Sequence, residues 1–206
     1  FGVPCEVLSE AIKACALLHD LGKMQQSWQD WASRHQKAKD PGYVHLEPLA
    51  HTDYDPDLEA DRLLDRSLET KRPPHAAAGA FYARLFIVPL LARAAGTEYG
   101  HRVFSSCIAA ILSHHGSWLS HQLENTVDHL CAGWEGALGR LLPALPRADY
   151  VKAAVVDRNK KQRIEEAVKE ALSFDEFEVS WPLTAYLCRT LRLSDQRATA
   201  EGGSND

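Results

Sequence analysis

Apolar residues recur at intervals of three and four along most of this 206-residue chain, and this spacing limits its possible folds more than any other feature. The pattern is clearest at residues 7–18, where the apolar positions share one helical face and Gly22 provides a natural stop. Few segments alternate between apolar and polar residues, as a half-buried strand would. The sequence therefore predicts an all-α protein.

The same periodicity predicts further helices, at residues 25–34, 58–68, 75–95, 99–115, 119–131, 149–156, 159–172 and 181–193. Pro89 should kink or divide one of them, because proline cannot donate a helical hydrogen bond. Prolines, glycines and aspartates between residues 36 and 74 mark turns around a single short helix. Residues 1–198 are expected to form one domain, and the small polar residues 199–206 a frayed tail.

The overall composition is that of an ordinary globular chain, with 45% hydrophobic and 25% charged residues. No stretch approaches the roughly 18 apolar residues of a membrane span. Five scattered cysteines without a CxxC pair favour a reduced, cytoplasmic setting. The formal charge of −5 argues against a protein that coats polyanions generally. It permits a nuclease, because bound divalent ions add positive charge where a phosphate must lie.

Histidines and aspartates stand at the apolar ends of several predicted helices, where an unpartnered polar group is costly. Four segments share this property: Leu18-His19-Asp20, Pro74-His75, Ser113-His114-His115 and Leu193-Ser194-Asp195. Each segment alone is weak evidence, since single His-Asp pairs and single histidines are common. Four separate helices that all deliver ligand-type residues predict a metal site.

Neutral imidazole and carboxylate groups are good ligands for manganese, iron, cobalt, nickel or zinc ions. Asp20 has two carboxylate oxygens and could therefore bridge two ions. Two bridged ions form the clamp that stabilises an in-line displacement at phosphorus. This residue pattern therefore points to phosphodiester chemistry.

The order of these motifs resembles the HD nuclease domain of the CRISPR-associated helicase-nuclease of type I interference. The string H-D-x-G-K at residues 19–23 is followed by a single histidine, then by His-His-Gly, and then by a late aspartate in "LSDQRA". The stretches "HDLGKMQQSWQDW" and "HHGSW" are similar too, and the resemblance covers about residues 15–198. The His-Asp pair alone marks the wide superfamily, whereas the His-His pair with the downstream aspartate narrows it to nuclease-like members.

The resemblance implies an HD-domain helical bundle that hydrolyses single-stranded DNA, as an endonuclease of antiviral defence. It implies two metal positions, one using His19, Asp20 and Asp195, the other using Asp20, His75, His114 and His115. A metal-bridged water would attack the phosphodiester, and Lys23 would stabilise charge on the phosphate or leaving oxygen. The expected ions are manganese, cobalt, nickel or iron, with magnesium or zinc as alternatives. The expected partners are a helicase domain, in the same or a separate chain, and an RNA-guided surveillance complex.

One departure from the family pattern leaves alternatives open. The family usually has a further metal-binding histidine on an earlier helix, and this sequence has no histidine before His19. Either that helix lies upstream of Phe1, which would suit an excised domain, or one metal has fewer ligands here. A nucleotide phosphohydrolase of HD type and a degenerate module that only binds a partner are the alternative functions. The sequence leaves the physiological metal, the cleavage polarity, the endo or exo mode and the oligomeric state open.

The remaining histidines are expected at the surface or in loops: His35, His45, His51, His101, His121 and His129. His51 is the one with a further possibility, because Asp53 and Asp55 follow it closely and this loop could add a ligand group. The five tryptophans are expected to pack in the core, although Trp118 could instead stack on a base of single-stranded DNA.

Overall fold

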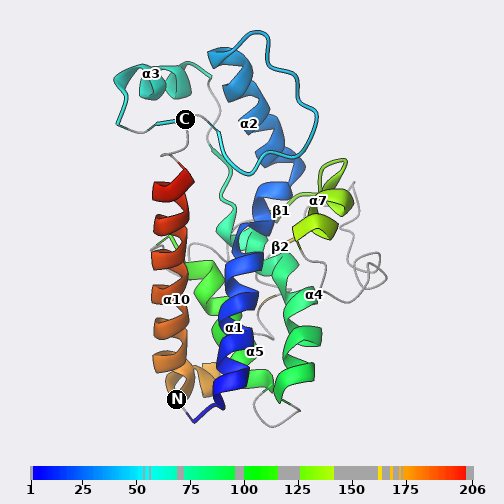
Figure 1. The fold of residues 1–206 in the computed structure, drawn as a ribbon, viewed down its shortest axis with the longest axis vertical. Helices are drawn as coiled ribbons and strands as arrows, with labels where there is room; N and C mark the ends of the chain where they lie inside the picture. Colours follow the sequence, from blue (N-terminus) through cyan, green and yellow to red (C-terminus); the bar gives the residue numbers. More distant parts are fainter. Residues whose placement is uncertain are drawn as a thin grey trace.

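The structure of the chain, a computed structural model, describes residues 2–52, 54–55, 57–68, 72–95, 100–115, 126–141, 162–163, 168, 172 and 174–202. Helices make up most of these residues (Figure 1), which confirms the predicted all-α class. Among the described residues, no helix has the length and hydropathy that crossing a membrane would require.

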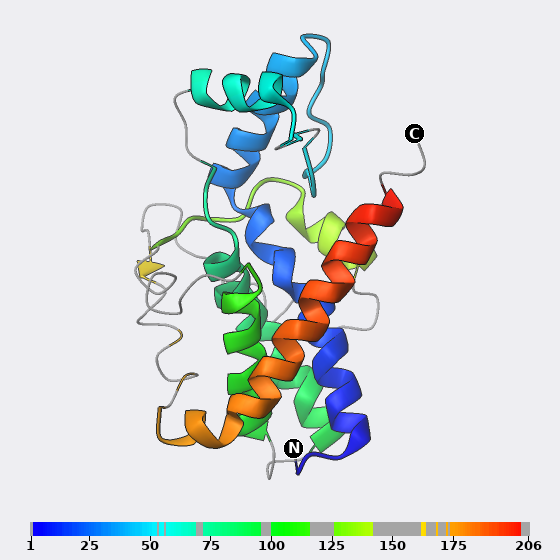
Figure 2. The ribbon, with the colours of Figure 1, turned by 90° about the vertical axis from the view of Figure 1, so that its left-hand side faces the viewer.

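Four helices pack together into the main bundle: α1 (Cys5–Leu18), α4 (Ala76–Ala95), α5 (Gly100–Ser113) and α10 (Phe174–Gly202). Figure 2 shows α10 crossing the bundle obliquely, in front of α1 and α5. The buried positions of α1 fall on one face, and α5 is buried along almost its whole length. The apolar spacing of the sequence thus produces one continuous core between these helices.

A short 3₁₀ helix, η1 (His19–Met24), follows α1 directly and lies against the start of α4. The first turns of α4 are rich in alanine, so the two backbones can approach closely. Gly22 and Gly79 form the point of contact: a Cβ on Gly22 would lie 2.6 Å from the Gly79 nitrogen, and closer still to the His75 carbonyl oxygen. Real Cβ atoms essentially never show such distances.

A smaller lobe at one end of the bundle contains α2 (Gln26–Lys39) and α3 (Glu59–Ser67). Trp28 and Trp31 are buried there and form a second apolar cluster, as the sequence predicted. Lys39 Nζ donates to Asp61 Oδ2 at 2.8 Å and joins the two helices. Helix α2 ends five residues later than expected, and α3 ends one residue earlier than expected.

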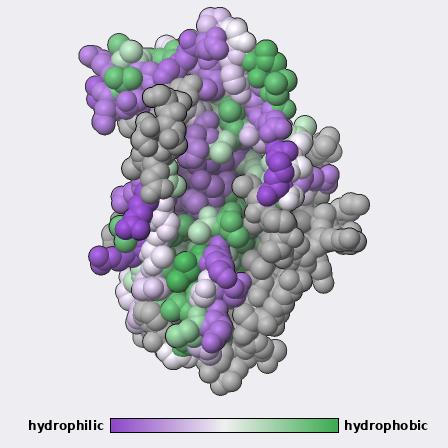
Figure 3. Space-filling view, in the orientation of Figure 1, coloured by the Kyte–Doolittle hydropathy of each residue, from purple (hydrophilic) through white to green (hydrophobic). Residues whose placement is uncertain are grey.

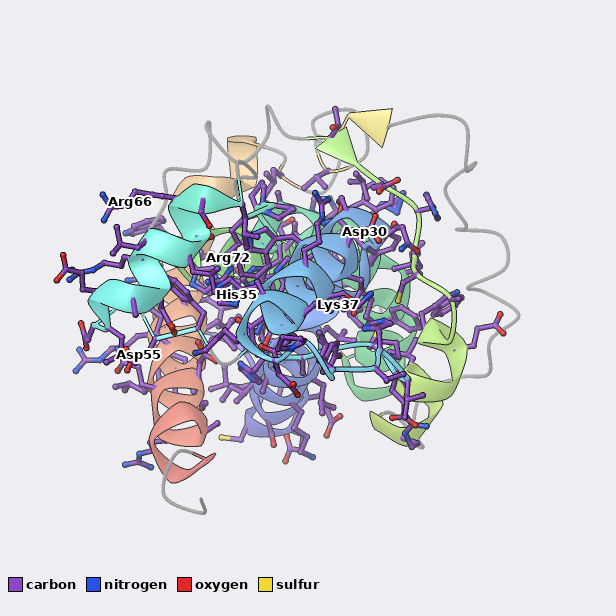
Figure 4. All side chains as sticks on the ribbon, turned by 90° about the horizontal axis from the view of Figure 1, so that it is seen from above. Asp30, His35, Lys37, Asp55, Arg66 and Arg72 are labelled. Atoms are coloured by element: carbon purple, nitrogen blue, oxygen red, sulfur yellow. The ribbon has the colours of Figure 1, made fainter. Side chains whose placement is uncertain are left out.

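His35 corrects the prediction that it lies at the surface, because its side chain is 0% exposed. It continues the buried face of α2 one turn beyond Trp31, and its ring lies 5.7 Å from that of Trp31 and 5.4 Å from that of Tyr54. Viewed from above, His35 and Arg72 lie between α2 and α3, whereas Arg66 points outward (Figure 4). The Arg72 guanidinium stands 5.5 Å from the ring of Trp31.

The connection after α5 contains β1 (Thr126–Val127), which pairs antiparallel with β2 (Gln162–Arg163), and α7 (Trp134–Leu141). The helix predicted at 119–131 is therefore wrong where its residues are described. The helix predicted at 159–172 is wrong at residues 162–163, whereas Val168 is helical. Helix α7 was not predicted. Short apolar runs do not distinguish strands from helices, and pairing between distant segments decided the outcome. The predicted helix at 149–156, Trp118 and His121 lie outside the described residues.

Helices α4 and α10 each contain a proline, and the sequence predicted a kink or division of the first and too late a start for the second. Pro89 does not divide α4, which continues to Ala95. Helix α10 begins at Phe174 rather than Trp181 and includes Pro182. Trp181 is 55% exposed, contrary to its expected core position. Helix α10 also continues through Gly202, past residue 198.

We predict that Gly79→Ala will lower the free energy of unfolding by about 1–3 kcal/mol, as overpacking of a tight contact does. The added methyl group would collide with the His19 carbonyl oxygen. Gly136→Ala on α7 is the matched control, because a Cβ there has no heavy atom within 4 Å. The control should raise stability by about 0.5–1 kcal/mol through its helix propensity. Equal effects of both variants in urea unfolding would contradict a tight contact at Gly79.

Candidate metal centre

The helix ends of the main bundle bring the predicted ligand residues together. His19 and Asp20 begin η1, His75 immediately precedes α4, and His114 and His115 follow the last residue of α5. Asp195 lies on the last third of α10, and its Oδ1 is 3.7 Å from His19 Nε2. All six side chains therefore belong to one cluster, although they are separated by up to 176 positions in the sequence.

The rings of His19 and His114 are each oriented by their own helix. His19 Nδ1 donates to the Ala16 carbonyl at 2.9 Å, and His114 Nδ1 donates to the Ile111 carbonyl at 2.5 Å. Because a carbonyl only accepts, the proton of each neutral ring lies on Nδ1 and the lone pair on Nε2. Both Nε2 atoms are buried without a hydrogen-bond partner among the described residues. A lone pair held in this way fits a metal ligand, because backbone contacts orient metal-binding histidines in the same manner.

Asp20 occupies the centre of the cluster. Its Oδ1 lies 3.3 Å from His75 Nε2, and its Oδ2 lies 3.4 Å from His19 Nε2 and 2.8 Å from Lys23 Nζ. Burial alone would raise the pKa of Asp20, but the hydrogen bond from His75 and the charge and hydrogen bond of Lys23 hold it well below its usual range. Asp20 is therefore ionised, and its two oxygens face different histidines.

The histidine nitrogens form two overlapping groups. The donor atoms of His75, His114 and His115 lie within 4.8 Å of one another, and so do those of His19, Asp20 and His114. His115 Nε2 is only 2.8 Å from His75 Nε2. His114 thus takes part in both groups, whereas the sequence interpretation assigned it to one.

Burial favours the neutral, ligand-competent form of three imidazoles of this cluster, those of His75, His114 and His115. Burial lowers the pKa of His114 to about 4, and burial together with the charge of His75 lowers that of His115 to about 4. Burial also lowers the pKa of His75, against the opposing effect of Asp20. A metal ion binds neutral imidazole, so the cluster is prepared for a cation at neutral pH.

Lys23 lies inside the site although it carries a charge, with only 6% of its surface exposed. Its ammonium group reaches Asp20 Oδ2, while its backbone carbonyl accepts a hydrogen bond of 2.7 Å from Gln29 Nε2. The structure therefore places a fixed positive charge beside the central carboxylate, as the sequence interpretation of Lys23 required.

Arg192 is a residue of the site that the sequence analysis missed. Its guanidinium donates to the Ser113 carbonyl at 2.7 Å and to the His114 carbonyl at 2.8 Å. These bonds join α10 to the end of α5. Arg192 lies three residues before Asp195, so they also fix the part of α10 that carries this aspartate. No pattern in the sequence indicates this role, because the two carbonyls lie 78 and 79 positions away along the chain.

His51 lies near the cluster but outside both donor groups. Burial lowers its pKa, as does the charge of Lys23, while Asp20 and Asp195 oppose that shift. Asp55 is turned toward α3, where its backbone nitrogen donates to Asp61, and Asp53 lies outside the described residues. In the space-filling view, hydrophilic residues line a hollow below the lobe of α2 and α3 (Figure 3).

We predict that the metal-free chain becomes less stable as the pH falls from about 6.5 to 4. In this window the unfolded chain protonates His114 and the folded chain does not, because burial lowers the pKa in the fold. The loss should be on the order of 3 kcal/mol, at about 1.4 kcal/mol per pH unit. Urea unfolding in the presence of a chelator measures it.

The matched variants are His114→Gln, which should remove the part of this pH dependence that His114 contributes and leave that of His115, and His101→Gln at an exposed position of α5, which should preserve both. An unchanged slope in His114→Gln would show that another group is responsible.

Comparison with known proteins agrees with this geometry. The family model described as "Cas3, HD domain" matches residues 1–195. No curated protein and no solved structure matches the chain. The match covers all six clustered side chains, the helical bundle and the motif order that the sequence analysis singled out. The chain belongs to the Cas3 HD-domain family.

Proposed function

We propose that this chain is a metal-dependent nuclease that cuts single-stranded DNA in type I CRISPR interference. Membership of the Cas3 HD-domain family implies the coarser part, a metal-dependent nuclease in a CRISPR context. One observation carries the proposal: two buried imidazole nitrogens that have no hydrogen-bond partner in the described part of the chain face an ionised aspartate. Leaving such nitrogens unpaired is costly, and a cation between them removes the cost.

Two ion positions fit the donor atoms. One would be held by His19 and Asp20, with Asp195 beside His19. The other would be held by His75, His114 and His115, with Asp20 Oδ1 next to His75. His114 lies within reach of both positions, but its Nε2 has one lone pair and can bind only one ion. Divalent transition-metal ions bound there would polarise the scissile phosphate and acidify a water that attacks phosphorus.

The chain's own residues supply the remaining requirements. Asp20 holds the two positions in a fixed relation, because each of its oxygens faces a different histidine. The buried ammonium group of Lys23 donates to Asp20 Oδ2. It would also bind a phosphate oxygen placed next to Asp20. Arg192 maintains the spacing between Asp195 and the His114 end of α5.

A single strand suits this site better than a duplex. Lys23 and His114 are almost completely buried, so the scissile phosphate must enter the fold to reach them. A flexible single strand can bend into such a site, while a duplex presents its phosphates on a stiff rod. A helicase domain and an RNA-guided complex would supply that strand.

We predict that Asp20→Ala will reduce the cleavage of circular single-stranded DNA at least about 100-fold, since removal of one transition-state contact typically costs that much. The control is Asp30→Ala, which removes an exposed carboxylate on α2 whose hydrogen-bond partner among the described residues is Gln26. The control should cut at the normal rate. Normal cutting by Asp20→Ala would exclude Asp20 as the bridge.

The circular substrate also distinguishes the alternatives, because it has no free end and is no mononucleotide. Hydrolysis of nucleotides without cleavage of the circle would favour the phosphohydrolase. Less than about one bound transition-metal ion per purified chain, by elemental analysis, would favour a module that only binds a partner.

We predict that a chelator stops the cleavage, and that manganese, cobalt or nickel restores it better than calcium. Calcium prefers shells made entirely of oxygen, whereas the donor groups here are dominated by imidazole nitrogen. Titration of each ion into the metal-free chain, with the initial cleavage rate as the readout, measures the order. Restoration by calcium alone would contradict the imidazole assignment.

A further inference from the structure

A cavity of about 260 Å³ opens beside the donor cluster, and no part of the proposed reaction uses it. We propose that it binds one nucleobase of the DNA strand, next to the phosphate that is cut. This proposal rests on the proposed function, since it names a further part of the same substrate. The cavity's connection to the cluster is direct, because Asp20 and Lys23 form part of its lining.

The remaining walls are mostly apolar. Leu17, Leu21 and Met24 from α1 and η1 form one side, and Pro48, Leu49, Ala50 and Ala137 form the other. Among the described residues that line the cavity, none has an amide or hydroxyl side chain. Apolar walls contact the flat faces of a base, but they do not read its hydrogen-bonding edge. The cavity therefore suits any base, as a nuclease without sequence preference requires.

The two sides of the cavity are held at a fixed separation by Gln29, whose side chain is buried. Its Nε2 donates to the Lys23 carbonyl at 2.7 Å and to the Leu49 carbonyl at 2.8 Å. Its Oε1 accepts a hydrogen bond of 2.8 Å from the Leu49 nitrogen. One amide thus connects the wall at residues 48–50 to the residue that contacts Asp20. A site held in this way is formed before the ligand arrives.

Two of the residues that line the cavity carry positive charge. Lys23 lies at the end nearest the cluster, and Arg140 of α7 lines the cavity as well. Arg140 bonds Glu47 at 2.9 Å, and both side chains are largely exposed. An exposed ion pair is worth little, so a backbone phosphate can replace Glu47 at Arg140 without a large cost. A base in the cavity therefore lies between a phosphate at the cluster and a phosphate at Arg140.

The test compares oligothymidylate with a strand of equal length whose sugars lack bases. Binding is measured by fluorescence anisotropy in the presence of a chelator, so that neither strand is cut. The chain should bind the strand without bases about tenfold more weakly, because burial of one base typically contributes that much. Ala137→Trp fills the cavity from α7 and should bind both strands equally.

Gly136→Trp is the matched control, because it places the same bulk on the adjacent, exposed position of α7 outside the cavity. It should retain the tenfold difference. Ala50→Trp fills the cavity from the segment at residues 48–50 and replaces Ala137→Trp if that variant loses its helical circular dichroism. Equal binding of the two strands by the unmodified chain, or a retained difference in both filled variants, would overturn the proposal.

The subsite and the nuclease function can fail separately. If the chain discriminates between the strands but does not cut DNA with manganese, the proposed function is wrong and the subsite stands. If it cuts oligothymidylate and the strand without bases at equal rates, and binds them equally, the nuclease stands and the subsite is wrong.

Discussion

The donor cluster depends on the contact between two backbones, at Gly22 in η1 and Gly79 in α4. A side chain at either position would separate the elements that carry His19 and Asp20 from the element that follows His75. That separation matters because a hydrogen bond or a ligand bond tolerates displacements of only a few tenths of an ångström. The packing of the bundle sets the approximate positions of the helix ends, and the two glycines bring them into ligand distance.

Close packing of the helix ends buries polar groups, and only some of these groups have hydrogen-bond or ion-pair partners among the described residues. Asp20 is satisfied by Lys23 and by the nearby histidines. The Nε2 atoms of His19 and His114, by contrast, are buried and unpaired among the described residues, and backbone carbonyls prevent their rings from changing tautomer. Each such group costs about 1–3 kcal/mol. An arrangement that costs stability and is maintained by specific hydrogen bonds is typical of a functional site.

The sequence singled out side chains that the structure brings together, because their signal is local: His19, His75 and His114 each adjoin an apolar run that must be buried. It failed where burial depends on distant partners. His35 appeared to be a surface residue until the lobe placed Tyr54 against it, and α7 has too short an apolar pattern to identify. Arg192 was missed because its function is to bond backbone carbonyls 78 and 79 positions away, which no spacing reveals.

The position of Lys23 accounts for how an acidic chain can act on a polyanion. With a formal charge of −5, the molecule has no general attraction for DNA. Positive charge must therefore be local, and Lys23 is held where the donor cluster and the apolar cavity meet. A phosphate at that point gains the ammonium and the bound ions, and the base attached to it has an apolar surface within reach. Under this proposal, recognition requires a phosphate at Lys23 and an unpaired base in the apolar cavity at the same time. A free phosphate has no base, and the bases of a duplex are paired.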